Sequence, residues 1–404
     1  MQLNDIAEFC GWEGYRAIEV ENEENGLVIR LGACRDRPGR CLHCKRTTWH
    51  VHDYRWREVR DLPVFGKGVF LEVERRRMRC PRCGLFTEEL PWLGARSRIT
   101  RRLGAAVAGL CRFMTIKHVS EFFGLGWDVV KNSDKEALER RLAGFDPRQA
   151  RILAMDEFAI QRGHRYASVV IDVENGNVLW VGRGRSREDI QPFFEMMGEE
   201  ACKHIKAVAI DCNATYALEI KQHCPNAHVV YDLFHIVARY GRDVIDRVRV
   251  DEANRLKNDR AGRKLVKGSR WLLLRNQENI VRPEDRIRLQ ELLKANRSLA
   301  KAYIMKDDLK TLWSFRDEKE AAQQWQQWYR QAVRSRIPPL VHFAKNLVQW
   351  REGILAHCRY PIHTSIIEGV NNKIKVIKRM AYGFRDDAYF FLKIRAAFYH
   401  PDPG

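Results

Sequence analysis

The spacing of apolar and polar residues divides the chain into segments with different secondary structure. Between Arg30 and Trp92, short alternating runs separated by turns predict a small β-rich module with little hydrophobic core. From Ser97 to about Leu142 the apolar residues recur at helical spacing, and two helices flank a turn at Gly124 to Gly126. Two helices joined by a short glycine-containing turn are typical of a helix-turn-helix.

A different pattern begins at Arg151. Three runs that read as strands come first, ILAMDEFAI, HRYASVVIDV and VLWVGRG, with a hairpin signal at Asn175-Gly176. They are followed by a helix near 187–199, the strand KAVAID, the helix ATYALEIKQHC and the strand AHVVYD. Three meandering strands followed by β-α-β predict a mixed α/β sheet.

After Asp232 the strand signal disappears for more than a hundred residues. Segments such as RWLLLRNQENI and AAQQWQQWYRQAVRS carry helical periodicity, which predicts an all-helical insertion over 236–345. A last helix over 365–380 has an apolar stripe, with Glu368 beside it; the stripe consists of Ile367, Val370, Ile374 and Ile377.

These patterns predict a multi-domain α/β protein. The expected parts are a small β-rich module over 1–93, a helix-turn-helix domain over 94–147, a first part of an α/β core over 148–235, the helical insertion over 236–345 and a second part of the core over 346–404.

Composition narrows the class of protein. The 404 residues include 71 Lys and Arg against 52 Asp and Glu, a formal charge of +19, which favours a polyanionic partner such as nucleic acid. The chain has no apolar run of 18 residues and no secretory signal at its start, so we expect a protein of the reducing cytoplasm with no membrane partner. In that compartment the 11 cysteines are not expected to form disulfides.

Four of the cysteines form two CxxC pairs, Cys41/Cys44 and Cys80/Cys83. Two such pairs supply four thiolates, the ligand set of a structural zinc ion, and a closed four-coordinate site leaves no position for a reacting water. The alternative ligands in the same stretch are Cys34, His43, His50 and His52.

Acidic residues stand where separate elements end. Asp156 ends the first predicted strand of the α/β region, Asp211 ends the strand KAVAID, and Glu368 lies on the last helix. Carboxylates that converge from separate elements can hold two Mg²⁺ or Mn²⁺ ions for phosphodiester chemistry. Asp232, which also ends a strand, is the rival for the second aspartate.

The segments LAMDEFAIQRGHRYASVVIDVENGNVLWV, VAIDCNATYALEIKQHCPNAHVVYDLFHI and IIEGVNNKIKVIKRMAYGFRD resemble the DDE transposases of the ISL3 insertion-sequence family. The two CxxC pairs and the helix-turn-helix occupy the places they have in that family, so the resemblance covers nearly the whole chain. One departure is local: where the family usually has Thr-Asn shortly before the glutamate, this chain has Thr364-Ser365.

The resemblance implies an RNase H-like catalytic fold interrupted by the helical insertion. Its matching positions give Asp156, Asp211 and Glu368 as the catalytic and magnesium-binding triad. Asp232 and His235 match a DxxH element that related families carry one strand later, which gives them an auxiliary role and favours Asp211 over Asp232. His235 is equally explained as a hydrogen-bonded structural residue.

Basic and amide side chains are candidate DNA contacts in three places: beside the zinc pairs, on the second helix of the helix-turn-helix, and after Glu368. They are Arg75, Arg76, Arg77, Arg98, Arg101, Arg102, Lys131, Lys135, Asn371, Asn372, Lys375, Lys378 and Arg379. Three tryptophans of the insertion, Trp271, Trp313 and Trp325, are expected to be mostly core, with Trp313 a candidate for stacking on a base.

Together these features predict a Mg²⁺-dependent DNA transposase that binds the terminal inverted repeats of its element and cuts and transfers strands. Two DNA ends must be joined to one target DNA, so a homodimer or a higher synaptic complex is expected, in the bacterial cytoplasm and at the nucleoid. Two alternatives remain open: a domesticated DNA-binding protein that no longer cuts, and an RNase H-like nuclease without strand transfer.

Overall fold

The chain folds into two units in the computed structural model, which describes residues 7–94, 97–161, 163, 165–275, 277–362 and 364–399. The first unit contains residues 1–143 and 378–392, and the second contains 144–377 and 393–404. The contacts therefore group residues 378–392 with the N-terminal part of the chain, whereas the sequence had placed all of 346–404 in the catalytic core.

The first unit begins with a sheet of five strands in the order β1-β2-β6-β5, with β7 paired to β6. The strands of the sheet are β1 (Tyr15–Glu23), β2 (Gly26–Ala33), β5 (Val51–Val64), β6 (Lys67–Cys80) and β7 (Gly84–Thr87), and a separate two-stranded ribbon joins β3 (Gly39–Arg40) to β4 (Thr47–Thr48). Strands β2 and β6 are parallel, and the other pairs are antiparallel. The predicted β-rich module is confirmed, but it starts fifteen residues before Arg30, with β1.

This sheet has a hydrophobic core of its own, so the prediction of little core was wrong. The buried cluster includes Trp12, Tyr15, Leu31, Leu71 and Leu93. Strand β1 supplies part of this core. The sequence pattern that predicted the module began only at Arg30, after β1, so this part of the core was missed. A core of this kind lets the sheet fold around apolar packing as well as around the cysteines.

Three helices complete the N-terminal part of the first unit: α2 (Arg101–Leu110), α3 (Ile116–Phe123) and α4 (Trp127–Leu142). Their core includes Val107, Val119 and Val130, one buried residue from each helix. Helix α3 begins at the N-cap Thr115, whose side chain accepts from His118 N–H, and ends at Gly124 in the left-handed conformation. The predicted helix pair and its glycine turn are confirmed, with α2 as a further helix before them.

The second unit is built on a five-stranded mixed sheet in the order β10-β9-β8-β11-β12. Strands β8, β9 and β10 form an antiparallel meander, while β11 and β12 run parallel to β8. Its strands and helices are β8 (Ile152–Gln161), β9 (Arg165–Asp172), β10 (Val178–Arg183), α5 (Arg187–Met197), α6 (Glu199–Lys203), β11 (Ala207–Ile210), α7 (Ala214–His223) and β12 (His228–Tyr231). The predicted mixed α/β sheet is confirmed, including the order of its elements along the chain.

The helical insertion follows β12. Its helices are α8 (Leu233–Tyr240), α9 (Asp246–Arg255), α10 (Arg260–Lys267), α11 (Arg270–Leu274), α12 (Pro283–Ala295), α13 (Arg297–Lys310), α14 (Glu318–Val333), α15 (Pro338–Leu347) and α16 (Arg351–Leu355). A π-helical turn, Gly241–Ile245, joins α8 to α9 without a break. Across the described part of 236–345 no strand occurs, as predicted.

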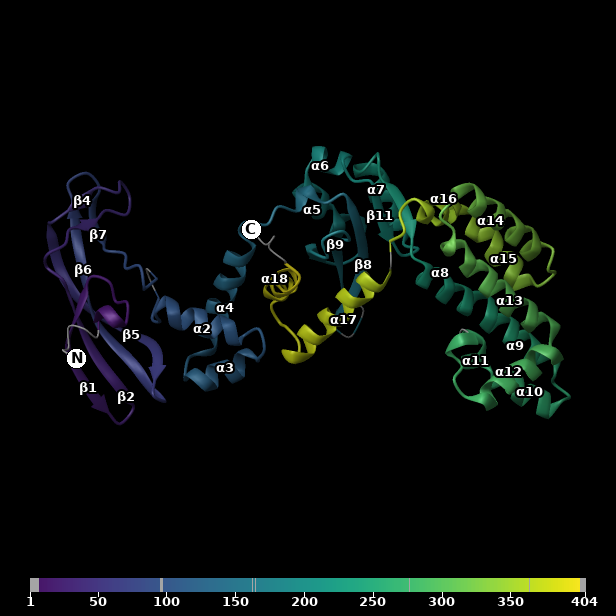
Figure 1. Cartoon of the computed structure of the whole chain (residues 1–404), viewed down its shortest axis with the longest axis horizontal. Helices are drawn as coiled ribbons and strands as arrows, with labels where there is room; N and C mark the ends of the chain where they lie inside the picture. Colours follow the sequence, from purple (N-terminus) through teal and green to yellow (C-terminus); the bar gives the residue numbers. More distant parts are fainter. Residues whose placement is uncertain are drawn as a thin grey trace. The chain divides into compact units, whose positions relative to one another are not determined.

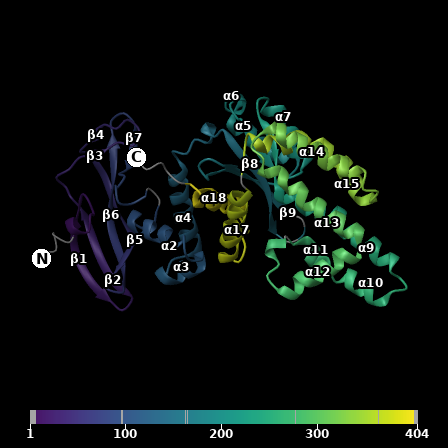
Figure 2. The ribbon, with the colours of Figure 1, turned by 45° about the vertical axis from the view of Figure 1, so that its right-hand side comes forward.

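The insertion packs against the sheet through one continuous core. Figure 1 shows its helices gathered on the side of the sheet where β11 lies, Figure 2 shows the same helices turned by 45°, and α16 contacts β12 directly. The Tyr240 hydroxyl donates to Ala302 C=O at 2.8 Å, and Tyr231 of β12 packs against Trp350. One buried cluster contains residues of both the sheet and the insertion, so the two fold as a single body.

Two helices end the chain, α17 (Thr364–Met380) and α18 (Asp387–Ala397). The predicted apolar stripe of α17 is confirmed, since Ile367, Val370 and Ile374 are buried. The side chains of Thr364 and Ser365, where the sequence departs from the family pattern, lie outside the described residues. Among the helices that are described, none is both long and apolar enough to cross a membrane. The cytoplasmic and nucleoid location stays a prediction.

Candidate active site and metal centre

The two CxxC pairs come together at the end of the first unit's sheet. The sulfurs of Cys41, Cys44, Cys80 and Cys83 all lie within 4.8 Å of one another, and the Sγ atoms of Cys44 and Cys80 are 3.6 Å apart. Four sulfurs bound tetrahedrally at the zinc–sulfur distance of about 2.3 Å would be about 3.8 Å apart, so the donor set fits zinc. Among the described residues this is the one group of metal-binding side chains gathered this closely, and it includes neither Cys34 nor the three histidines.

Local backbone geometry aims the thiols inward. The residue after each pair, Lys45 or Gly84, is in the left-handed conformation, at φ 61° and 81° respectively. Backbone N–H groups of Arg82 and Cys83 lower the pKa of the Cys80 thiol to about 7, which favours the thiolate that a metal binds. The turn at the second CxxC therefore supplies backbone donors to one of the ligands, Cys80.

In the second unit, three aspartates end or lie in neighbouring strands at one level of the sheet. Ala154 of β8 pairs with Ala209 of β11, and Ile210 of β11 pairs with Tyr231 of β12, both in parallel register. Continuing these registers toward the strand ends brings Asp156, Asp211 and Asp232 side by side. Asp211 is one strand from Asp156 and Asp232 is two strands away, about 4.8 Å per strand.

The environment of these carboxylates disfavours their ionised form. Burial raises the pKa of Asp211 to about 6, and the charge of Asp156 adds to the increase while His235 opposes it. Burial likewise raises the pKa of Asp156 and of Asp232. Like charges held together in a partly dry site are stabilised by a cation, which makes this cluster a candidate site for one.

The third predicted carboxylate, Glu368, is on the exposed surface of α17. One helical turn further on, Asn371 Nδ2 donates a hydrogen bond of 2.6 Å to Asp156 Oδ2. Lys375, one turn beyond Asn371, is near enough for its charge to lower the pKa of Asp156. The structure thus brings the helix of Glu368 to the aspartates, but it does not gather Glu368 with them as tightly as the four cysteines are gathered.

Asp232 and His235 are at the start of α8. Asp232 is the N-cap of that helix, and its Oδ1 accepts from Phe234 N–H at 2.7 Å. His235 Nε2 lies 3.7 Å from Asp232 Oδ2, and its charge lowers the pKa of all three aspartates. Asp232 therefore has a structural role as a helix cap, and His235 faces the whole cluster.

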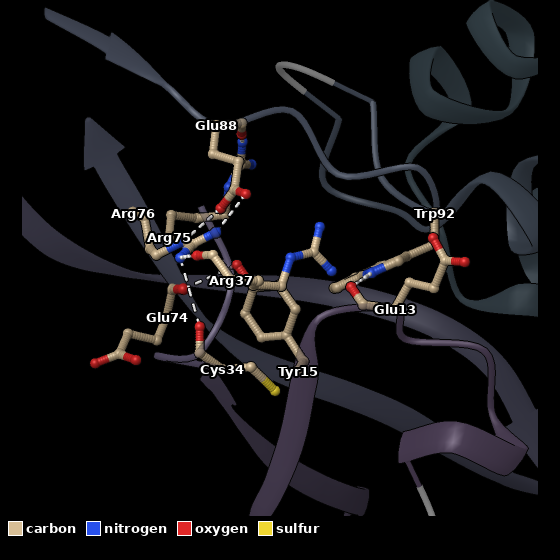
Figure 3. A network of polar contacts seen from close by, with 9 residues as sticks. All are labelled: Glu13, Tyr15, Cys34, Arg37, Glu74, Arg75, Arg76, Glu88 and Trp92. Atoms are coloured by element: carbon tan, nitrogen blue, oxygen red, sulfur yellow. Dashed lines mark hydrogen bonds and ion pairs between the residues drawn. The ribbon is translucent and has the colours of Figure 1, made fainter. Parts of the chain in front are cut away.

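The arginines of β6 are not where the sequence placed them. Arg75 and Arg76 are 5% and 3% exposed, and Figure 3 shows them turned into a buried network. Arg76 forms an ion pair of 2.5 Å with Glu88, and Arg75 donates to the Glu88 carbonyl. The expectation that these two residues contact DNA is corrected: β6 is an inner strand, and its arginines pair inside the unit.

Arg77, Arg102 and Lys131 are also engaged within the first unit. Arg77 pairs with Asp53 at 2.9 Å, Arg102 pairs with the buried Asp61, and Lys131 of α4 pairs with Asp386 at 2.8 Å. Neither Asp61 nor Glu88 had been singled out from the sequence. Nothing near them in the sequence marked them as buried partners, since Glu88 is one of two adjacent glutamates and Asp61 follows a stretch of mixed charge.

Other predicted DNA contacts remain on the surface. Arg98 and Arg101 are exposed and line a hollow of about 460 Å³ together with Asn132 and Arg140 of α4. Lys135 is half-exposed and pairs with Glu139. On α17, Lys378 is partly buried, and the exposed residues are Asn372, Lys375 and Arg379.

The tryptophans of the insertion divide between core and surface. Trp313 and Trp325 are buried, and Trp313 Nε1 donates to the carbonyl of Tyr231. Trp313 is therefore a packing residue and is not available to stack on a base. Trp271 is 68% exposed.

Comparisons with known proteins agree with these features along the chain. Residues 153–394 match the ISL3 family model described as a transposase, residues 37–83 match the zinc-finger of transposase IS204/IS1001/IS1096/IS1165, and residues 88–137 match the helix-turn-helix domain of transposase family ISL3. These matches define a transposase, an enzyme class that cuts and transfers DNA.

The chain belongs to the ISL3 family of transposases. It is 49% identical, over 96% of both chains, to the transposase for insertion sequence element IS1001 of Bordetella parapertussis. It is 28% identical, over 91% of this chain and 88% of the relative, to the transposase for insertion sequence element IS1557 of Mycobacterium tuberculosis. The CxxC pairs thus belong to a zinc ribbon, and α2 to α4 to a DNA-binding domain.

Proposed function

We propose that this transposase uses an RNase H-like fold and an acidic triad, Asp156, Asp211 and Glu368, to cut and join DNA strands with two Mg²⁺ or Mn²⁺ ions. The observation that carries the proposal is the level placement of Asp156 and Asp211 on adjacent parallel strands, with the helix of Glu368 bonded to Asp156. The register favours Asp211 over Asp232 as the partner of Asp156, because Asp232 is one strand further away.

The side chains present fit such ions. They offer carboxylate oxygens, the ligands that Mg²⁺ and Mn²⁺ prefer, and their raised pKa values mark a site where added positive charge is stabilising. Divalent cations held there would activate the attacking oxygen and stabilise the leaving oxygen of the phosphodiester. The structural zinc of the ribbon is a separate site, with sulfur ligands.

The surrounding residues complete the environment for a phosphodiester. Lys375 places positive charge beside Asp156, and the ring of His235 lies beside Asp232. Asn372, Lys378 and Arg379, which lie on α17 with Glu368, are proposed to contact the DNA backbone. Their charge would also set a steep dependence of DNA affinity on salt.

The first unit is proposed to recognise the terminal inverted repeats of the element. Helix α4 is the base-reading candidate, and Arg98 and Arg101 of the hollow beside it are the proposed phosphate contacts. Since two ends must be cut and joined to one target, the active form is proposed to be a homodimer or a larger synaptic complex at the bacterial nucleoid.

The second candidate function is DNA binding without cutting. Its distinguishing feature would be loss of an acid or of its partners, whereas Asp156, Asp211, Glu368 and the Asn371 contact are all present here. An RNase H-like nuclease would share the metals but would not transfer strands.

The test is cleavage and strand transfer on a duplex carrying the element's own end, with Mg²⁺ supplied or withheld. Asp156→Ala, Asp211→Ala and Glu368→Ala are expected to abolish both steps while end binding is retained, and Asp232→Ala to keep part of the activity. Tight binding by the wild type with no cutting under Mg²⁺ or Mn²⁺ would support the binding protein, and cutting without transfer would support the nuclease.

A further inference from the structure

The side chain of Asn371 was expected to face DNA, but it is turned toward the aspartates. Its Nδ2 lies 2.6 Å from Asp156 Oδ2, a short hydrogen bond between residues 215 positions apart in the chain. A donor bound to a carboxylate makes a stronger hydrogen bond than one bound to a neutral acceptor. The contact is therefore a specific link between α17 and the middle strand of the sheet.

Asp156 is held at both of its oxygens. Its Oδ1 accepts from the backbone N–H of Glu157 at 2.8 Å, and its Oδ2 accepts from Asn371. Burial raises the pKa of Asp156, while the two hydrogen bonds lower it and so favour the ionised form. Each carboxylate oxygen keeps a second lone pair, so the hydrogen bond from Asn371 leaves the carboxylate able to bind a cation.

The orientation of the Asn371 amide follows from this partner. Only the NH₂ group can face a carboxylate oxygen, so the amide oxygen Oδ1 must point away from Asp156. That oxygen is buried and has no hydrogen-bond partner among the described residues. A buried acceptor left without a partner costs about 1–3 kcal/mol, so a purely structural residue at this position would not be expected to leave it unpaired.

The position of Asn371 on α17 gives the contact a consequence for Glu368. Residues three apart on a helix lie on the same face, one turn from each other. Fixing Asn371 against Asp156 therefore fixes both the rotation of α17 and its position along its axis at Glu368. The neighbouring Asn372 does not share this role, because it is exposed and accepts from Lys375 on its own helix.

We propose that Asn371 is a positioning residue of the carboxylate site: it orients Asp156 and sets the place of Glu368 relative to the two aspartates. This inference rests on the proposed two-metal function. It assigns to Asn371 a role in forming the site, where DNA contact had been expected.

Mn²⁺ binding to the full-length, zinc-loaded protein tests this, followed by electron paramagnetic resonance without DNA. Asn371→Ala removes the donor, and Asn371→Asp keeps the shape but places a second carboxylate against Asp156. Both are expected to weaken Mn²⁺ binding about 10–100-fold, the usual effect of losing a group that orients a metal ligand. Asn254→Ala, at an exposed position of α9, is the matched control and is expected to bind Mn²⁺ as the wild type does.

Two further measurements separate positioning from a general loss of structure. Turnover at saturating DNA should decrease in Asn371→Ala while the DNA dissociation constant and the melting temperature stay near the wild-type values. The Asn371→Ala/Glu368→Gln double variant should bind Mn²⁺ more weakly than Glu368→Gln alone, but by a smaller factor than Asn371→Ala weakens binding in the wild-type background, because part of the effect of Asn371 acts through Glu368.

The outcomes distinguish the inference from the function it rests on. If wild-type Mn²⁺ binding depends on Asp156 but Asn371→Ala or Asn371→Asp binds as tightly as wild type, the positioning role is refuted and the two-metal proposal stands. If the wild type shows no Mn²⁺ binding that Asp156→Ala removes, and no cutting, the proposed function itself fails.

Discussion

The hydroxyl of Tyr389 in α18 donates a hydrogen bond to the buried carboxylate of Asp134 in α4, across 255 positions of the chain. Lys131, one turn earlier on α4, pairs with Asp386 and lies over the Tyr389 ring. Asp386 and Tyr389, near the end of the chain, are thus part of the packing of its DNA-binding domain.

Replacing Tyr389 by Phe should destabilise the first unit by about 1–3 kcal/mol, since it removes a donor from a buried acid. The measurement is chemical denaturation of the full chain, followed by tryptophan fluorescence and circular dichroism. The control is Tyr382→Phe, at a residue that is 91% exposed. Equal stability of the two variants would contradict this account of the contact.

The arginines of the first unit should separate into two groups. Arg76→Ala is expected to lower stability by about 3–5 kcal/mol, because Glu88 is left as an unpaired buried charge. Arg98→Ala and Arg101→Ala should leave stability nearly unchanged, and each should reduce the slope of log Kd against log salt by about 1. Binding titrations at several salt concentrations and thermal melts test this. The grouping is wrong if Arg76→Ala changes the salt slope without loss of stability, or if Arg98→Ala and Arg101→Ala lower stability without changing the salt slope.

The zinc ribbon should contain one zinc ion per chain. Cys44→Ser and Cys80→Ser are expected to lose it and to unfold the end of β6, because the apolar cluster around the cysteines is small. Zinc released on denaturation, measured with a colorimetric chelator, gives the count. Cys34→Ser is the control and should retain the ion; loss of zinc from that variant would instead place Cys34 among the ligands.

The raised pKa of Asp211 predicts a pH dependence of stability in buffer free of Mg²⁺. Between the ordinary value of 3.8 and about 6, the folded carboxyl retains a proton that the unfolded one has lost, so stability decreases as pH rises through this window. Asp211→Asn removes this effect. It should stabilise the protein above pH ~6.5 by an amount on the order of 1–3 kcal/mol, with a gain near zero below pH ~4.

Melting temperatures of the zinc-loaded protein across that pH range provide the check on Asp211. Asp251→Asn, at an exposed position, is the control and should show no such trend. A gain for Asp211→Asn that does not change with pH would mean that removal of the charge is not its cause.

Local pattern was sufficient for much of the fold. The apolar run of β8 and the 3.6-residue period of α17 are properties of neighbouring residues, and both elements formed where expected. The CxxC pairs were recognisable for the same reason, since spacing within each pair determines the turn. The four sulfurs then met as the ligand chemistry predicts.

Long-range pairing was not readable in the same way. Arg75 and Arg76 look like surface cations until β6 is known to lie between β2 and β5. Asn371 looks like a DNA contact until α17 is known to cross Asp156, because nothing near it in sequence carries that information. In both cases the sequence correctly indicated a side chain that forms ion pairs or hydrogen bonds. It did not indicate that the partner is another residue of the protein.

Residues 378–392 belong to the first unit although they lie near the end of the chain. The first unit therefore cannot complete its folding until these residues have been synthesised. A ribosome makes β1 to α4 first, then more than two hundred residues of the second unit, and only afterwards Asp386 and Tyr389. Domains generally fold in the order of synthesis. Helix α4 therefore forms well before Asp386 and Tyr389 have been synthesised and can contact it. A product truncated between Leu142 and Asp386 retains the four cysteines of the zinc ribbon and the whole of α4 but lacks Asp386 and Tyr389, the partners of α4, so we expect its DNA-binding domain to be less stable than that of the full-length transposase.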